Sequence, residues 1–155
     1  MSRPRKFAQG VPQGSPLSAQ FYCLASASIP GAIKKRCPQA LINQFADNLT
    51  IQLSSEKADT AAREIHPALD ALGDWAKNNY VQISAEKREA MVISVDPREV
   101  NGKSQSPLFL NQMPVKYNKN LTILGTTIDS QLRFTDQMKA SKTKLTRKNN
   151  MLKSL

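Results

Sequence analysis

The chain has 155 residues, enough for one domain with a hydrophobic core, and 40% of them are apolar. Its formal net charge is +10, and every acidic residue lies between Asp47 and Asp136, so both ends are purely basic. This pattern suggests a polyanionic partner such as nucleic acid, although a soluble basic protein without that function would have the same composition. No apolar run is long enough to span a membrane. Two cysteines without metal-ligand spacing indicate reduced thiols in an intracellular protein, in the nucleus or the cytoplasm.

The first motif is the run of residues 10–18, which combines two glycines with two prolines. Such a run predicts a rigid turn, and Ser15 or Ser18 can cap a helix over residues 17–29 that closes at Pro30-Gly31. Exposed backbone amides before a helix can hold a phosphate or a nucleotide. A plain turn before a core helix would explain the same residues.

A short basic connector then leads to two β-prone runs, residues 40–46 and 49–53, which flank Asp47-Asn48. Asp and Asn tolerate positive φ, so the pair predicts a tight hairpin turn. Asp47 and Asn48 are then either turn residues and nothing more, or a carboxylate site on a rigid hairpin tip within reach of Mg²⁺ and phosphates.

The middle of the chain predicts helix followed by strands. An apolar face recurs from Asp59 to Asn79, with a kink or a new helix start at Pro67. Residues 80–84 alternate as a strand, residues 86–89 form a charged turn, and residues 90–95 are apolar enough for a strand buried on both faces.

The last third predicts a polar loop over residues 96–107 and a hairpin around Asn111-Gln112. Residues 121–128 predict a strand in which Gly125 marks a bulge or a close backbone approach. From Thr135 a lysine-rich helix follows, with a thin apolar seam of residues seven apart. This helix is either solvated along most of its surface or laid along a phosphate backbone.

Four stretches in order resemble the reverse transcriptases of non-LTR (LINE-type) retrotransposons. They are the glycine-rich loop, the hairpin Phe45-Ala46-Asp47-Asn48, residues 75–94, and residues 124–134. The resemblance covers nearly the whole chain. It implies an α+β fold, with the C-terminal portion of a polymerase palm over residues 1–134. An antiparallel sheet backed by two helices would form the palm, and residues 135–155 would start a basic thumb helix.

The resemblance also implies a chemistry, which is RNA-directed DNA polymerisation by two-metal nucleotidyl transfer with Mg²⁺ or Mn²⁺. By resemblance, Asp47 is a catalytic metal ligand, Asn48 is a degenerate second position, and Lys87 is a proton donor near the pyrophosphate. The partners would be an RNA template, a DNA primer and deoxynucleotides. The expected contacts are Pro12, Gln13, Gly14, Ser15 and Phe45 for the nucleotide, Leu124 and Gly125 for the primer end, and Lys139, Lys142, Arg147 and Lys148 for the nucleic-acid backbone.

Two departures from the family bear on activity. The family's first catalytic aspartate precedes the glycine-rich loop, but residues 1–46 contain no acid. The amide of Asn48 brings an oxygen without a charge. We therefore expect metal binding that is weak or absent in this chain alone, and no polymerisation unless an upstream polymerase fragment contributes. The alternatives are a remnant that binds nucleic acid without catalysis, or a decayed remnant without function.

Overall fold

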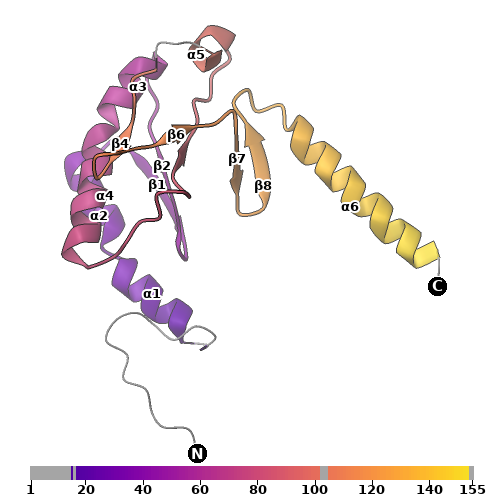
Figure 1. Ribbon diagram of the computed structural model, residues 1–155, viewed down its shortest axis with the longest axis horizontal. Helices are drawn as coiled ribbons and strands as arrows, with labels where there is room; N and C mark the ends of the chain where they lie inside the picture. Colours follow the sequence, from indigo (N-terminus) through magenta and orange to yellow (C-terminus); the bar gives the residue numbers. More distant parts are fainter. Residues whose placement is uncertain (1–14, 16, 102–104, 154–155) are drawn as a thin grey trace, which may run out of the picture. The chain divides into compact units, whose positions relative to one another are not determined.

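The computed structural model describes residues 15, 17–101 and 105–153, whose helices and strands are labelled in Figure 1. These residues form two compact units. The first unit comprises the described residues up to Ser54 together with Glu64–Gln82, and the second comprises Ser55–Arg63 and the described residues from Ile83 onward. Pro12, Gln13 and Gly14 lie outside the described residues. The mixture of helices with small sheets confirms the predicted α+β class.

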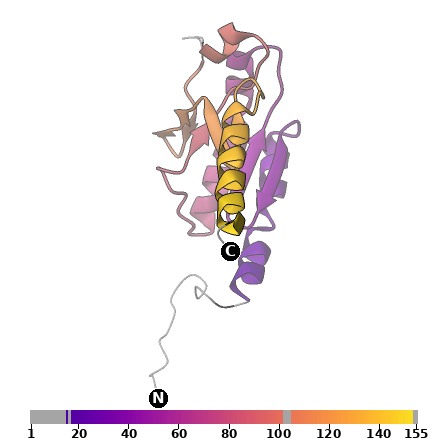
Figure 2. The same ribbon diagram turned by 90° about the vertical axis from the view of Figure 1, so that its right-hand side faces the viewer.

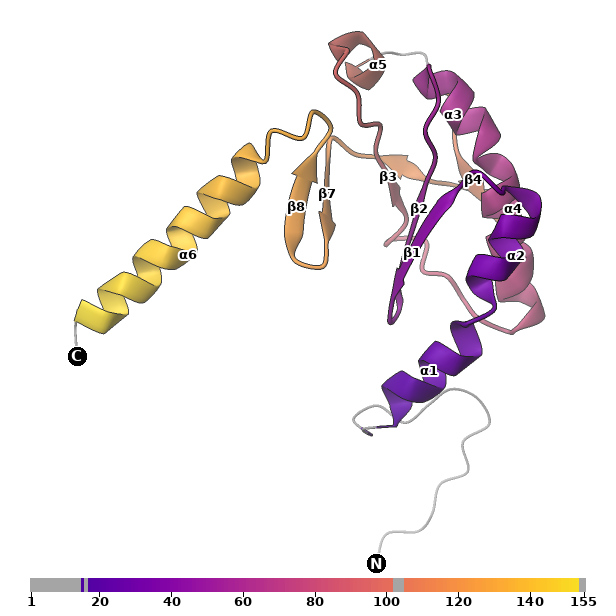
Figure 3. The ribbon, with the colours of Figure 1, turned by 180° about the vertical axis from the view of Figure 1, so that it is seen from behind.

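The first unit contains helices packed beside a β-hairpin, and α2 and α4 lie side by side (Figures 1 and 3). Small residues recur along one face of α4, which lets the two helices approach closely. The elements are α1 (Ser18–Ser26), α2 (Ile29–Arg36), β1 (Leu41–Phe45), β2 (Asn48–Gln52) and α4 (His66–Asn78). The buried apolar residues of this unit are Ile29, Ile33, Cys37, Ala40, Ala68, Ala71, Leu72 and Ala76.

Helix α2 was not expected, because Pro30-Gly31 was interpreted as the end of a helix. In the structure α1 ends at Ser26, and a second helix begins at Ile29 with Pro30 in its first turn. Proline is tolerated there because the first backbone N–H groups of a helix have no intrahelical acceptor. Ile29 and Ile33, one turn apart, are both buried, so core packing fixes the new helix. The predicted single helix over residues 17–29 and the connector over residues 32–38 are therefore wrong.

Helix α4 confirms the predicted start beside Pro67 and the predicted end at Asn78. Its C-terminus also explains why residues 80–84 do not form the predicted strand. Tyr80 has φ of +55°, the N–H of Tyr80 donates to the Lys77 carbonyl at 3.3 Å, and the N–H of Val81 donates to the Ala76 carbonyl at 2.8 Å. These two bonds form a Schellman motif, which uses a left-handed residue to close the helix and so interrupts an extended conformation.

The second unit contains short pairs of β-strands and the helices α5 and α6. It also contains α3 except for the last residue of that helix, Glu64. Its elements are α3 (Ala58–Glu64), β3 (Glu89–Ala90), α5 (Pro97–Asn101), β4 (Phe109–Leu110), β5 (Met113–Pro114), β6 (Lys116–Tyr117), β7 (Asn120–Ile123), β8 (Thr126–Asp129) and α6 (Thr135–Lys153). The short helix α5 lies in a stretch that was predicted to be a loop. Pro97 begins α5, and the Asp96 carboxylate accepts the N–H of Arg98 at 2.9 Å, which caps it.

A cluster of polar contacts around Asp59 ties α3 to the segment before β4 within the second unit. The Ser106 hydroxyl donates to the Asp59 carboxylate, which also pairs with Arg63 at 2.7 Å. The hydroxyl of Tyr117 donates to the Ser106 carbonyl at 3.1 Å. The hydrogen bond from Ser106 holds the pKa of Asp59 below its usual value, and burial raises the pKa of Tyr117.

The strands do not assemble into the predicted antiparallel sheet. The described residues form four separate two-stranded pairs, of which β1–β2, β4–β5 and β7–β8 are antiparallel and β3–β6 is parallel. The predicted strand over residues 90–95 is reduced to the pair at Glu89–Ala90, and Val95 is 99% exposed. An extended segment is stabilised only by a neighbouring strand, and residues 91–95 have no strand partner among the described residues.

Candidate active site

The hairpin of β1 and β2 is confirmed, with its turn one residue earlier than predicted. Phe45 pairs with Asn48, so Ala46 and Asp47 form the two-residue turn. Ala46 has φ of +48°, a left-handed conformation that usually costs an L-residue about 1–2 kcal/mol. The Asn48 amide donates to the Asp47 carboxylate at 3.4 Å, and both side chains are exposed. The tip therefore presents a carboxylate and an amide to solvent, beside Phe45, which is 64% exposed.

This tip matches part of a magnesium site. Mg²⁺ prefers oxygen ligands, and the Asp47 carboxylate and the Asn48 carbonyl oxygen are of that kind. Within the described ranges, no group of three or more His, Cys, Asp or Glu side chains could hold a metal ion. The residues fit one or two ligand positions, and the remaining positions would have to be filled by phosphates, water or another segment.

Three residues that sequence reasoning missed attach the hairpin to helix α1. The Gln44 side-chain amide donates to the Ser26 hydroxyl at 2.6 Å, and that hydroxyl donates to the Tyr22 carbonyl at 2.8 Å. Burial raises the pKa of Tyr22, and the negative charge of Asp47 raises it further. Helix α1 thus lies beside the Asp47 turn. Alternation along β1 places Gln44 on the face opposite Phe45, which is the one signal that could have indicated this contact.

The glycine-rich loop enters the described residues only at its end. The Ser15 hydroxyl accepts the N–H of Leu17 at 3.4 Å, and the Ser15 carbonyl accepts the N–H of Ser18 at 3.1 Å. Helix α1 begins at Ser18. Pro12, Gln13 and Gly14 are not described, so the nucleotide contacts of this loop stay predictions.

Lys87 lies in an exposed turn of the second unit, whereas Asp47 belongs to the first. Its neighbour Arg88 holds this turn, because its guanidinium donates to the carbonyls of Leu110 at 2.7 Å, Ser84 at 3.2 Å and Ile83 at 3.3 Å. The carbonyls of Ile83 and Ser84 therefore bond a side chain instead of a strand partner. The role of Lys87 near the pyrophosphate stays a prediction.

Leu124 and Gly125 form the two-residue turn of the β7–β8 hairpin, with Ile123 paired to Thr126. Their φ angles are +49° and +81°, and two successive positive values define a type I′ turn. The prediction of a bulge at Gly125 inside one continuous strand is therefore wrong, because the chain reverses there. Asn111 and Gln112 have the same backbone pattern between β4 and β5, which confirms that predicted hairpin.

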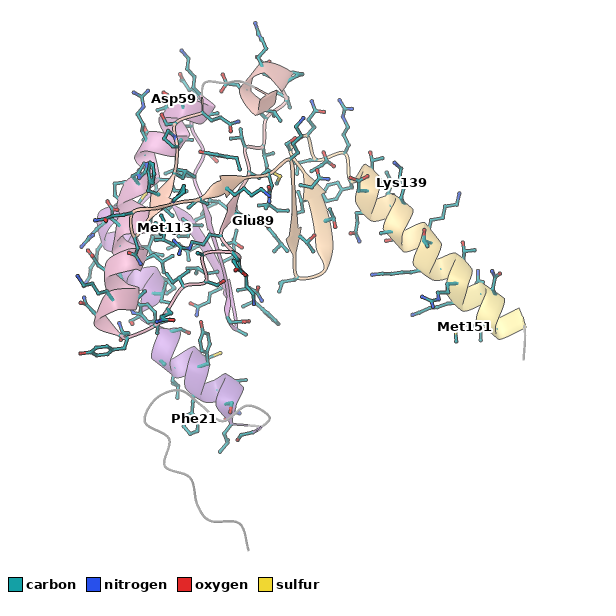
Figure 4. All side chains as sticks on the ribbon, in the orientation of Figure 1. Phe21, Asp59, Glu89, Met113, Lys139 and Met151 are labelled. Atoms are coloured by element: carbon teal, nitrogen blue, oxygen red, sulfur yellow. The ribbon has the colours of Figure 1, made fainter. Side chains whose placement is uncertain are left out.

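Helix α6 begins at Thr135 as predicted and runs without interruption to Lys153 (Figure 2). Its long side chains point away from the helix axis into solvent, as Lys139 and Met151 show in Figure 4. Lys139 pairs with Asp136 at 3.9 Å. In the described part of the chain, the other three predicted backbone contacts, Lys142, Arg147 and Lys148, form no ion pair. The described portion contains no helix with both the length and the apolar character needed to cross a membrane.

Comparison with known proteins agrees with the resemblance. The chain is 25% identical over 145 residues to the probable RNA-directed DNA polymerase from transposon X-element of Drosophila melanogaster, with 94% of this chain covered. It is 27% identical over 143 residues to the probable RNA-directed DNA polymerase from transposon BS of the same organism, with 90% covered. It is 28% identical over 150 residues to the RNA-directed DNA polymerase from mobile element jockey, also of Drosophila melanogaster, with 92% covered.

The aligned segment spans only 15–16% of the length of these relatives. No solved structure gives a significant match to the chain. The profile of the family described as reverse transcriptase (RNA-dependent DNA polymerase) matches residues 1–128. Because this match covers most of the chain, the protein belongs to the reverse transcriptase family, with homologues among the polymerases of non-LTR retrotransposons.

Proposed function

We propose that this chain forms one wall of an RNA-directed DNA polymerase site. Residues 1–134 would be part of the palm, and residues 135–155 would start the thumb. The observation that carries the proposal is the position of Asp47, which is exposed in a two-residue turn inside the segment that matches the family. In this position its carboxylate can reach a metal ion and the phosphates of an incoming deoxynucleotide.

The family resemblance assigns the other predicted site residues to the same reaction. The deoxynucleotide would contact Pro12, Gln13, Gly14, Ser15 and Phe45, and the exposure of Phe45 supports this role. Gln13 and Gly14 would also contact the RNA template. Leu124 and Gly125 would support the primer end, since the type I′ turn leaves their backbone exposed. Lys87 would donate a proton near the pyrophosphate, and its exposed ammonium group is compatible with that role.

We expect a second carboxylate to come from outside these 155 residues. Two-metal nucleotidyl transfer needs more negative charge than Asp47 and a neutral Asn48 supply. No acid precedes Asp47 in the sequence, and the described residues contain no cluster of metal ligands. We therefore expect the 155-residue polypeptide to bind Mg²⁺ weakly and to be inactive by itself, and a polypeptide carrying the upstream palm strand to restore synthesis.

Primer extension tests this proposal. The purified chain should give no template-dependent synthesis with Mg²⁺ or Mn²⁺, whereas the chain joined to the corresponding upstream palm of a relative should extend a DNA primer on RNA. In the joined protein, Asp47→Ala should abolish extension, and Asp70→Ala, an exposed acid of α4, should leave it unchanged. Synthesis by the isolated chain, or equal activity of the two variants, would contradict the proposal.

A second candidate function is nucleic-acid binding without catalysis, favoured by the exposed cations of α6. The segment of α6 that carries Lys139, Lys142, Arg147 and Lys148 is about 14 Å long, at a rise of about 1.5 Å per residue. This spacing suits contacts with successive phosphates.

Fluorescence anisotropy with an RNA–DNA primer–template measures this binding. The affinity should fall steeply with salt, and neutralising Lys142, Arg147 and Lys148 together should reduce the salt slope by about 2–3. Neutralising the same number of cations in the first unit, Lys34, Lys35 and Lys77, is the matched control. An equal reduction of the salt slope in both proteins would contradict a specific role of α6 and would indicate only non-specific attraction of nucleic acid to a basic protein.

A further inference from the structure

We propose that Asp129 locks the β7–β8 hairpin to the start of α6, so that hairpin and helix form one rigid arm. The part of this inference that concerns nucleic acid rests on the proposed function, in which the hairpin supports the primer end and α6 follows the backbone. The lock itself rests on contacts within the second unit.

The Asp129 residue satisfies four successive backbone N–H groups between the hairpin and the helix. One carboxylate oxygen accepts from Gln131 at 3.0 Å and from Arg133 at 3.1 Å, and the other accepts from Phe134 at 2.6 Å. The N–H of Leu132 donates to the Asp129 carbonyl at 3.0 Å. Hydrogen bonds to a charged acceptor are stronger than neutral ones, so this carboxylate is the main constraint on the connection.

The connection has a conformation that it would not adopt unaided. Leu132 and Phe134 have φ of +55° and +56°, in the left-handed region that costs an L-residue about 1–2 kcal/mol. Such residues persist only where the surroundings impose the conformation. Both side chains are exposed, so core packing does not supply the constraint. The hydrogen bonds to Asp129 do.

Two further hydrogen bonds fix the direction of the helix. The Asn120 amide on β7 donates to the Asp136 carboxylate at 2.9 Å, and the N–H of Thr127 on β8 donates to the Gln137 side-chain oxygen at 2.9 Å. Both strands of the hairpin are therefore bonded to the first turn of α6. A helix joined only through its N-terminus could swing, whereas one held at three points keeps a fixed angle to the hairpin.

The lock determines where the cations of α6 lie. The helix has 19 residues, which corresponds to about 28 Å, so a small rotation at Asp129 displaces its far end by many ångströms. Asp129 bonds the backbone of its own segment and is not expected to touch substrate. It is therefore a positioning residue, which acts through the hairpin at Leu124-Gly125 and through the cations of α6.

A distance measurement between two spin labels tests the lock. Labels at Thr126→Cys in the hairpin and Asn149→Cys on α6 would be placed in a Cys23→Ser background, because Cys23 is exposed and Cys37 is buried. The 12 residues from Gln137 to Asn149 span about 18 Å of helix, within the range of the method. The labelled chain should give one narrow distance distribution, which Asp129→Ala should broaden while α6 stays helical by circular dichroism.

Asp96→Ala is the matched control, because it also removes a half-buried carboxylate that accepts a backbone N–H in the second unit. It changes the net charge equally and should leave the distribution narrow. Where Asp129→Ala does not fold, Asp129→Asn replaces it and should broaden the distribution less, because one acceptor oxygen is kept. A broad distribution in the unsubstituted protein, or a narrow one in both Asp129 variants, would overturn the lock.

Binding of an RNA–DNA primer–template separates the lock from the proposed function. Asp129→Ala should bind more weakly than Asp96→Ala, although both proteins have the same net charge. Equal affinities combined with a broadened distribution would leave the lock standing and overturn its part in nucleic-acid binding. Failure of both proteins to bind would contradict the proposed function, while the distance measurement would still decide the lock.

Discussion

The side-chain amide of Gln44 donates to the hydroxyl of Ser26 at 2.6 Å, and this bond joins the strand before Asp47 to the end of α1. Ser26 is 1% exposed, so its hydroxyl would be costly to leave without a partner. The Asp47 turn thereby has a fixed position relative to α1, which follows directly from the glycine-rich loop.

Gln44→Ala should lower the free energy of unfolding by about 1 kcal/mol, because a part-buried hydrogen bond is lost while Ser26 keeps its bond to Tyr22. Urea unfolding followed by circular dichroism measures the change. Gln52→Ala, on the exposed end of β2, is the control and should change stability by less than about 0.5 kcal/mol. Equal effects of the two substitutions would show that the bond to Ser26 contributes nothing.

The backbone of Ala46 is strained in the Asp47 turn, so a substitution there should raise the free energy of unfolding. Its φ of +48° is unfavourable for alanine and acceptable for glycine, so Ala46→Gly should stabilise the protein by about 0.5–1 kcal/mol. Ala27→Gly, in an exposed right-handed position after α1, should destabilise it by a similar amount. Thermal unfolding of the two variants should therefore shift in opposite directions. A loss of stability in both would indicate that the left-handed conformation is not maintained.

The Asp129 lock should weaken in acid. Hydrogen bonds from the backbone of Arg133, and then of Gln131 and Phe134, hold the pKa of Asp129 below its usual value near 3.9. Because the folded pKa is lower than the unfolded one, the carboxylate stabilises the protein fully above about pH 5, and this contribution is lost as the pH falls through the unfolded and then the folded pKa.

The comparison of the unsubstituted protein with Asp129→Asn measures this effect. The pKa values of Asp59 and Asp96 are also lowered, through bonds to Ser106 and Arg98, so both proteins should become less stable in acid. The difference between their unfolding temperatures should be constant from pH 7 to about pH 5 and should shrink below about pH 4. A difference that does not change with pH would exclude the charge of Asp129 as its cause.

The local turn chemistry could be predicted from the sequence, and the pairing of distant segments could not. Asn111-Gln112 and Asp47-Asn48 each predict a hairpin, because few residue types accept a tight turn. The second turn was predicted one residue too late, since it consists of Ala46 and Asp47. Residues 80–84 alternate as a strand would. They form no strand, because Tyr80 has a left-handed backbone and the guanidinium of Arg88 binds the carbonyls of Ile83 and Ser84.

The candidate site divides in the same way. The place of Asp47 on an exposed hairpin tip could be predicted because its motif is local, and its role as a metal ligand stays a prediction. Gln44, Ser26 and Asp129 were missed because each acts through a contact that the linear sequence does not mark. The lock at Asp129 has one sequence signal, an aspartate at the end of a strand a few residues before a helix, and such a signal also describes many ordinary turns.

Substitutions of Gly125 and Gly31 give the sharpest test of the turn at Leu124-Gly125, where a continuous strand was predicted. Neither glycine has any atom within 4 Å of an added Cβ, so substitution by alanine changes only the backbone preference. Gly125 has φ of +81°, and Gly125→Ala should destabilise the β7–β8 hairpin by about 1 kcal/mol. Gly31 lies in α2, and Gly31→Ala should stabilise the protein by up to about 1 kcal/mol. Urea unfolding of both variants measures the two effects. Stabilisation by Gly125→Ala would mean that Leu124-Gly125 does not form a type I′ turn, and the proposed primer contact at this tip would lose its structural basis.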